Sequence, residues 1–548
     1  MAAAVLPPPA PRREEDRAVL AGADPASTLA RQAEGAPVSL LLDPPTAVPD
    51  PYGWMRDEKR ENVEVLDHLA AENAYTEAAT AHLAGLREEL YGEMLGSIRE
   101  TDFTLPRPRG AYAYYSRSFE GKSYGVHCRA PSENVGDATD WDGAAGSPVL
   151  GGEEVVLDVN ALAEGEKYCS TGNVKTSPSH KLLAYSADFS GDETCQFWVK
   201  DLESGEVVDH DPKLDVYGQL VWGSDDSTLF YVTMDAAHRP YKVYRRILGS
   251  DAEDELLFTE PDELYWSGIH KSLDGKYLYV STSSKETSEV HFLDLNDPNA
   301  KLQCVAARRK KVRYRVEHRE GTWWIASNVG GTPNMRLMSA PATPECASEW
   351  KDVAGADGAA IFDGGYERSL GGVTAFKTHL VCSGREGGIP RVWVVGLDGD
   401  DVASAEMLAF DEEAHDVGTV AHHEYDSGSI VVAYDSMVTP LSHISIRLDD
   451  ASARTVLKTK AVPGYNRSLY ACERTTVKSR DGETDVPVSV VYRRDVMERH
   501  RASGTPVPTH LYGYGSYGAC MEASFSATRL ALLDRGAVYV IAHVRGGG

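Results

Sequence analysis

A repeated strand pattern constrains the fold of this chain more than any other feature. In each copy a polar turn precedes a short apolar strand, and a second strand follows that ends at Asp or at a turn; clear copies begin near Leu182, Trp222 and Ser272. We count about seven copies, at roughly the 40–50-residue period of propeller blades. A single sheet cannot bury both of its faces, whereas blades around an axis cover one another. The pattern therefore predicts a seven-bladed β-propeller.

The segments on either side of the repeats follow other patterns. Apolar residues recur at helical spacing from Val63 to Ala70, and a second helix is expected over 76–97. After Pro463, strands are expected over 469–476 and 486–493 around a turn at Asp481-Gly482, followed by a strand that runs into a glycine-rich loop at 509–518, a helix at 526–534 and a strand at 537–544. The last strand is almost entirely apolar, as in a parallel sheet buried on both faces. This order predicts the beginning of a doubly wound α/β unit.

These patterns divide the chain into four parts. Residues 1–36 hold a cluster of prolines and charges and are expected to be a disordered lead. Residues 37–109 form a helical segment, 110–464 the propeller, and 465–548 the start of the α/β domain.

Composition excludes several classes of function. The formal charge is −28, from 83 acidic and 55 basic residues, which disfavours a nucleic-acid partner. No apolar stretch is long enough to cross a membrane. The eight cysteines are widely spaced without any C-x-x-C, so we expect reduced thiols, a cytoplasmic location and no metal site.

Two local patterns resemble other functions but have simpler interpretations. The basic run from Arg308 to Lys311 continues into alternating Val312, Tyr314 and Val316, which favours a half-buried strand with a solvated face. His422 and His423 are adjacent, and adjacent residues of a strand point to opposite faces, so chelation of a metal by this pair is not expected.

Two motifs of the C-terminal part carry a family resemblance. Leu511-Tyr-Gly-Tyr-Gly-Ser-Tyr-Gly and Ile541-Ala-His-Val-Arg-Gly-Gly-Gly resemble the start of the hydrolase domain in the prolyl oligopeptidase family, and the Gly-Ser-Tyr-Gly form is similar to oligopeptidase B. Asp50-Pro-Tyr-Gly-Trp-Met-Arg-Asp, Glu72-Asn-Ala-Tyr-Thr and Ile98-Arg-Glu-Thr-Asp agree with it. The resemblance covers nearly everything after residue 37.

The resemblance implies both a fold and an activity. In this family a seven-bladed propeller is inserted in an α/β-hydrolase domain and limits access to short peptides. Oligopeptidase B cleaves after Arg or Lys with a Ser-Asp-His triad and without metal or organic cofactor, which suits an acidic chain. The expected partners are short basic peptides.

The resemblance assigns roles to three residues. Tyr514 matches the tyrosine whose hydroxyl helps to hold the oxyanion of the tetrahedral intermediate. Glu522 matches one of two acids that bind a basic residue of the peptide, but Ser524 stands at the position of the second. Arg545 either shapes the rim of the active site or anchors a loop by pairing with a carboxylate, and we favour the anchor.

The nucleophile itself is not found in these residues. No G-x-S-x-G motif is present, and Ser516 lies in the loop that supplies oxyanion donors in α/β hydrolases. We therefore expect the triad to lie beyond Gly548, so that the 1–548 chain is a truncated fragment and inactive alone. Two alternatives stay open, namely a prolyl oligopeptidase that cleaves after Pro and a non-catalytic propeller that only binds.

Overall fold

The computed structural model describes residues 18–21, 46–57, 59–137 and 141–546. The chain divides into two compact units, Met1–Glu93 and Met94–Gly548, and each is described by itself. The segment 1–36, expected to be disordered, lies outside the described residues apart from one short strand. No described helix is long and apolar enough to span a bilayer.

The first unit is a strand pair followed by helices. Its elements are β1 (Ala18–Ala21), β2 (Thr46–Pro49), η1 (Gly53–Met55), α2 (Val63–Thr80), η2 (Ala81–Leu83) and α3 (Ala84–Gly96), which runs past the boundary. The Asn62 side chain accepts the Glu64 N–H, which caps α2. The expected second helix starts at Ala84 instead of residue 76, because a 3-10 turn separates two helices whose apolar spacing is continuous.

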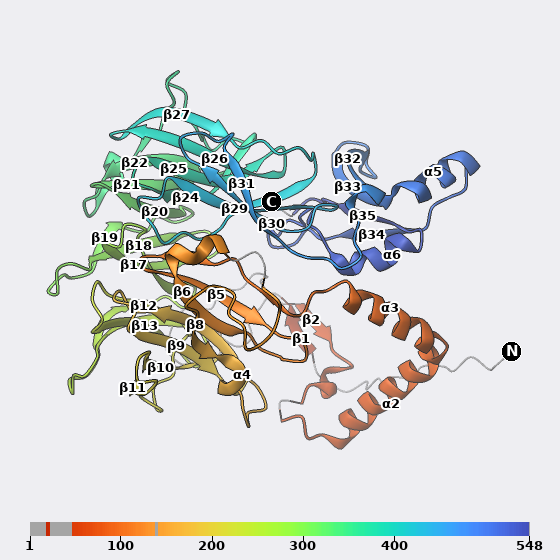
Figure 1. Ribbon diagram of the computed structural model, residues 1–548, viewed down its shortest axis with the longest axis horizontal. Helices are drawn as coiled ribbons and strands as arrows, with labels where there is room; N and C mark the ends of the chain where they lie inside the picture. The colour runs from red at the N-terminus through yellow and green to blue at the C-terminus, as the bar shows by residue number, and fades with distance from the viewer. Residues whose placement is uncertain (1–17, 22–45, 58, 138–140, 547–548) are drawn as a thin grey trace. The chain divides into compact units, whose positions relative to one another are not determined.

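The second unit contains seven successive sheets, which form the blades of a β-propeller (Figure 1). Blade 1 has β3 (Asp102–Phe103), β4 (Arg107–Arg109), β5 (Tyr112–Ser118), β6 (Val126–Pro131) and β7 (Glu154–Asp158); blade 2 has β8 (Ser170–Thr176), β9 (Leu182–Asp188), β10 (Gln196–Asp201) and β11 (Val207–His210); blade 3 has β12 (Leu220–Trp222), β13 (Thr228–Met234), β14 (Pro240–Ile247) and β15 (Glu255–Thr259); blade 4 has β16 (Trp266–Lys271), β17 (Tyr277–Ser283), β18 (Ser288–Asp294) and β19 (Gln303–Ala306).

The remaining blades have the same antiparallel order. Blade 5 has β20 (Tyr314–Arg319), β21 (Thr322–Ser327), β22 (Arg336–Pro341) and β23 (Lys351–Asp352); blade 6 has β24 (Arg368–Ala375), β25 (His379–Glu386), β26 (Ile389–Asp398) and β27 (Asp401–Met407); blade 7 has β28 (His415–Thr419), β29 (Ser429–Ser436), β30 (Ser442–Arg447) and β31 (Arg454–Thr459). Short helices lie between strands: η3 (Ser132–Asp137), α4 (Val159–Leu162), η4 (Cys346–Glu349) and η5 (Arg467–Leu469).

Apolar side chains fill the spaces between consecutive blades. The largest cluster packs Tyr279 and Phe292 of blade 4 against Trp323 of blade 5, and similar clusters join the other neighbours along the chain. The central strands are more deeply buried than simple alternation predicts, since every residue of β21 is buried. A strand between two blades is covered on both faces, and a near-continuous apolar run meets that requirement.

Two of the simpler local interpretations need correction. The strand after the basic run begins only at Tyr314, and the Arg308 side chain is only 29% exposed, because its guanidinium pairs with Glu260, whose side chain is fully buried. His422 and His423 follow the end of β28 and are not strand residues, so the argument from opposite strand faces does not apply to them.

A further sheet follows the seven sheets of the propeller and matches the expected α/β unit. Its order is β32-β33-β35-β34, with β33 antiparallel and β34 parallel to β35. The elements are β32 (Tyr470–Lys478), β33 (Asp485–Arg493), α5 (Arg494–Ser503), β34 (Thr509–Gly513), η6 (Ala527–Arg529), α6 (Leu530–Asp534) and β35 (Val538–Ala542). β35 is not buried on both faces as expected, since only Val538 and Ile541 are buried, while β34 is an exposed edge strand in the described chain. The sequence analysis did not anticipate α5.

Polar contacts join the last blade to the first and close the ring. Lys458 on β31 donates to Asp102 on β3 at 2.7 Å, and its ammonium lies 3.4 Å from the centroid of the Phe103 ring. The Gly110 N–H donates to Glu424 at 2.6 Å. No strand is shared between blades 1 and 7, so side chains have to hold this junction.

We predict that Lys458→Met lowers the melting temperature of the chain. Methionine can keep contact with Phe103, but Asp102 loses its cation in a half-buried position, at a cost of about 1–3 kcal/mol. Thermal denaturation followed by circular dichroism measures the effect. Lys122→Met, on an exposed turn, is the matched control. Equal melting temperatures for the two variants would show that the ion pair does not hold the ring.

Candidate active site

The candidate site begins where β34 ends. The loop from Tyr514 to Gly518 follows directly, and the Tyr514 side chain is 39% exposed. Its hydroxyl has no hydrogen-bond partner among the described residues, so it is available to a ligand. Tyr514 therefore meets the first requirement for an oxyanion donor.

Glycines allow this loop to pack against the segment that follows β35. A Cβ atom at Gly515 would overlap the carbonyl oxygen of Arg545, and one at Gly546 would overlap the carbonyl oxygen of Gly515. The Gly518 N–H donates to the Gly546 carbonyl at 3.0 Å. Side chains at 515 and 546 would push the two loops apart, so the two glycine motifs form one structural unit.

Tyr517 shows that this loop is conformationally constrained. Its φ of 61° lies in the left-handed region, which is uncommon for a residue other than glycine. The ring is 91% exposed and lies 5.8 Å from the ammonium of Lys285, in the β17–β18 connection of blade 4. The loop therefore faces the propeller on this side.

The segment after the loop docks on blades 6 and 7. Glu522 forms an ion pair with Arg385 on β25. The Ser524 hydroxyl donates to Asp416 on β28 at 3.1 Å, and the Phe525 N–H donates to Asp435 on β29 at 3.1 Å. These three contacts thus fix the segment before η6 relative to the propeller.

Burial dominates the electrostatics of this junction. Burial, followed by the nearby charge of Glu522, raises the pKa of Asp416. Burial raises the pKa of Asp435 to about 7, although the hydrogen bond from Phe525 opposes the shift. Both carboxyl groups therefore hold protons more tightly than exposed aspartates.

The other candidate residues have mainly local contacts. The Arg545 guanidinium lies 3.6 Å from Asp481, in the turn between β32 and β33, and its side chain is 72% exposed. This contact is the one that a loop anchor requires. The His543 Nε2 lies 2.8 Å from the hydroxyl of buried Ser489, and burial lowers the pKa of this histidine.

Sequence reasoning did not find the propeller residues at this junction. Arg385, Asp416 and Asp435 lie at least 90 positions before the residues of the 522–525 segment that they contact, and no local motif marks them. Among these three residues, only Asp435 has an unusual sequence context, because this charged residue directly follows the apolar run of β29.

The comparisons with known proteins agree with this architecture. The sequence profile described as "Prolyl oligopeptidase, N-terminal beta-propeller domain" matches residues 40–459. A curated relative, dipeptidyl aminopeptidase BI of Pseudoxanthomonas mexicana, is 36% identical over 91% of this chain and 66% of its own length. The fold and the sequence thus define a propeller protein of the peptidase type, and the chain belongs to the prolyl oligopeptidase family.

Solved structures add a comparison of the fold. Oligopeptidase B from Leishmania major matches 99% of this chain and 72% of its own length, with a TM-score of 0.84 and 32% identity. Oligopeptidase B from Trypanosoma brucei, with covalently bound antipain in a closed form, matches 98% of this chain and 72% of its own, with a TM-score of 0.83 and 34% identity. The expected resemblance to oligopeptidase B and the seven-bladed fold are confirmed. The chain spans about two thirds of the length of the curated relative.

We predict that Asp435→Asn reduces the loss of stability that occurs as pH rises. The ordinary pKa of an aspartate is about 4. Between that pH and about 7, folded Asp435 binds a proton that the unfolded chain has released, so stability falls across this window. Asparagine keeps an oxygen for the Phe525 N–H and cannot ionise, so the variant should be the more stable form above pH 7. Melting temperatures between pH 5 and 8 measure this.

The exposed Asp426 supplies the matched control for this experiment. Asp426→Asn should follow the wild-type curve. Parallel curves for Asp435→Asn and the wild type would contradict the assignment of the pH dependence to Asp435.

Proposed function

We propose that this chain provides the access-limiting propeller and the oxyanion loop of a serine oligopeptidase that cleaves short peptides after Arg or Lys. One observation carries the proposal. The Tyr514 hydroxyl extends from a loop whose backbone is fixed by the interlocked glycines 515 and 546. A preorganised donor aimed at developing negative charge lowers the barrier to acyl transfer by about 2.7–4 kcal/mol.

The nucleophile is proposed to lie outside residues 1–548. These residues contain no G-x-S-x-G turn, which is the element that exposes the serine in α/β hydrolases. The 1–548 chain alone is then a binding and positioning unit without turnover. The eight free cysteines support a reducing compartment, and we place the protein in the cytoplasm.

An acidic pair supports the preference for basic peptides. Ser524 replaces the second acid of the loop, but its hydroxyl contacts Asp416, which lies close enough to Glu522 for their charges to interact. The propeller therefore supplies a carboxyl group beside the loop acid. Arg385 already pairs with Glu522, so a basic peptide has to share or displace that guanidinium.

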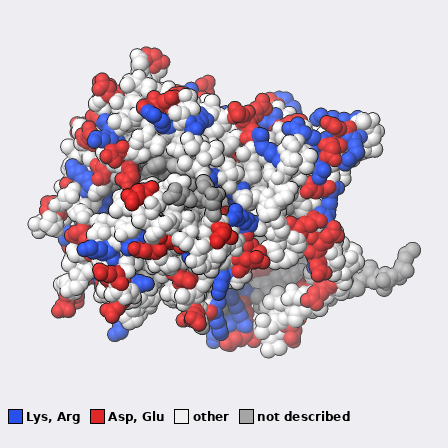
Figure 2. All heavy atoms as spheres, in the orientation of Figure 1, with Lys and Arg blue, Asp and Glu red and all other residues white. Residues whose placement is uncertain are grey.

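On the face drawn in Figure 2, acidic and basic side chains are interspersed over much of the surface, which does not favour a nucleic-acid partner.

A second candidate activity comes from the curated relative. Dipeptidyl aminopeptidase BI, at 36% identity, is named for the removal of dipeptides. That activity requires a free amino terminus on the substrate, whereas the proposed oligopeptidase accepts a blocked one. Cleavage after Pro and a purely binding role are the remaining alternatives.

We predict that the product of the complete coding sequence of this locus releases aminocoumarin from amino-blocked substrates ending in Arg or Lys, and that the 1–548 chain does not. Fluorescence assays with blocked Arg-Arg, Lys and Gly-Pro substrates, and with unblocked Arg-Arg, measure the preference. Cleavage only of the unblocked substrate would establish the dipeptidyl activity. Cleavage only after Pro would overturn the basic preference, and turnover by the 1–548 chain would overturn the location of the triad.

We predict that Tyr514→Phe lowers kcat of that complete enzyme by about 10²–10³-fold with little change in KM, because the lost donor acts in the transition state. Steady-state kinetics on the preferred blocked substrate measure both constants. Tyr517→Phe removes a hydroxyl from the same loop at a 91% exposed position and serves as the control. An unchanged kcat for Tyr514→Phe would remove this tyrosine from the oxyanion hole.

A further inference from the structure

Three side chains with metal-binding atoms share one face of the outer hairpin of blade 4. His291 on β18 is the direct cross-strand partner of Cys304 on β19. Directly opposed residues have Cβ atoms about 4.5–5.5 Å apart. Glu289 lies two positions before His291, and alternate residues of a strand point to the same face. The pairing of two strands therefore brings a carboxylate, an imidazole and a thiol together.

The donor atoms of these residues are close enough for one ion. A carboxylate oxygen of Glu289, a ring nitrogen of His291 and the Sγ of Cys304 lie within 4.8 Å of one another, and all three residues are half-buried. The His291 Nδ1 is buried and has no hydrogen-bond partner in the described residues. An unsatisfied buried polar atom is costly, and an ion bound at Nδ1 itself would remove that cost.

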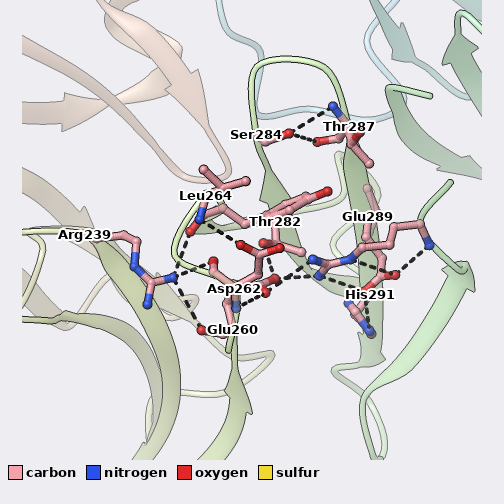
Figure 3. A network of polar contacts seen from close by, with 12 residues as sticks. Arg239, Glu260, Asp262, Leu264, Thr282, Ser284, Thr287, Glu289 and His291 are labelled. Atoms are coloured by element: carbon pink, nitrogen blue, oxygen red, sulfur yellow. Dashed lines mark hydrogen bonds and ion pairs between the residues drawn. The ribbon is translucent and has the colours of Figure 1, made fainter. Parts of the chain in front are cut away.

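Hydrogen bonds hold the carboxylate of Glu289 in place (Figure 3). The Arg308 N–H donates to its Oε2 at 2.7 Å, while its Oε1 lies 3.5 Å from the Nε2 of His291. The Arg308 guanidinium is itself anchored on Glu260, whose Oε2 also accepts the Thr282 hydroxyl at 2.7 Å. Oε1 also accepts the Arg308 guanidinium at 3.4 Å, so an ion has to share this oxygen with Arg308 while Oε2 keeps its backbone contact.

A further carboxylate comes from the next blade and lies beside Cys304, although its oxygens are not within 4.8 Å of all three donors. Glu345 lies between β22 and η4, with a left-handed φ of 52°. Its N–H donates to the Cys304 carbonyl at 3.0 Å, and its carboxylate lies beside the Cys304 thiol. The left-handed backbone directs this exposed residue back toward blade 4.

We propose that Glu289, His291, Cys304 and Glu345 form a binding site for Zn²⁺ that ties blade 4 to blade 5. A mixed set of thiolate, imidazole and carboxylate donors suits this ion, which takes four ligands in structural sites. Binding releases the Cys304 proton to solvent, and the resulting thiolate donates an electron pair to the metal. The ligands come from three separate segments, so no short cysteine motif marks them in the sequence.

The site is tested with metal-free 1–548 chain and Zn²⁺ alone. Competition with a chromophoric chelator should show one tightly bound ion per chain, and Co²⁺ in its place should give a thiolate-to-metal charge-transfer band. His291→Gln and Cys304→Ser should each weaken Zn²⁺ binding by more than about 100-fold, because loss of an outer-shell partner already costs about 10–100-fold. His510→Gln and Cys472→Ser remove the same residue types elsewhere and should bind as the wild type does.

A second measurement uses the unmodified protein and does not depend on the folding of variants. Zn²⁺ should protect Cys304 from alkylation by iodoacetamide in the folded chain, with Cys472 unaffected, as read by mass spectrometry of the peptides. The absence of stoichiometric binding, or wild-type affinity in Cys304→Ser, would overturn the proposal. Equal alkylation of Cys304 with and without Zn²⁺ would do the same.

Discussion

A single hydrophobic core joins the last propeller blade to the α/β sheet, and the geometry of the candidate site depends on it. Met437 and Val438 follow β29, and they pack with Tyr470 at the start of β32 and with Ile541 of β35. Ala523, in the segment after the loop 514–518, lies in the same cluster. Apolar burial contributes about 25 cal/mol per Å² and has no preferred direction. It therefore holds the two parts together, while the polar contacts around it determine their relative position.

Those polar contacts are unusual because most of them use carboxyl groups in half-buried positions. Glu522 has a matched cation in Arg385, whereas Asp416 accepts the Ser524 hydroxyl and Asp435 accepts the Phe525 backbone N–H. A hydrogen bond from a neutral donor does not offset the cost of burying a charge, so the pKa of each aspartate rises. The junction thus combines one ion pair with two aspartates whose ionisation costs stability because they are buried, although each hydrogen bond itself favours the ionised form.

The sequence predicted the parts of this structure that depend on local patterns. Seven strand repeats became seven blades, because blade formation requires only alternating turns and apolar strands. The sequence predicted a glycine-rich loop at 509–518, and the structure shows why glycine is needed there, since a Cβ at 515 would overlap the Arg545 carbonyl and one at 546 would overlap the Gly515 carbonyl. The 3-10 break between α2 and α3, the helix α5 and the exposure of β34 were missed. They depend on capping and on neighbouring strands and not on the periodicity within the segment.

The contacts of the candidate site likewise depend on residues that are distant along the chain. Along the chain, Ser524 stands at the position where the resemblance places a second acid. In space, its hydroxyl contacts Asp416, so a carboxyl group is restored from a strand that lies 108 positions earlier. The same holds for Cys304, which is a lone cysteine along the chain but faces His291 across a β-ladder and Glu345 across a blade boundary. In a propeller each blade is a local unit, but every surface between blades combines distant segments. Specificity can therefore change through single substitutions on one blade while the repeat pattern that determines the fold stays the same.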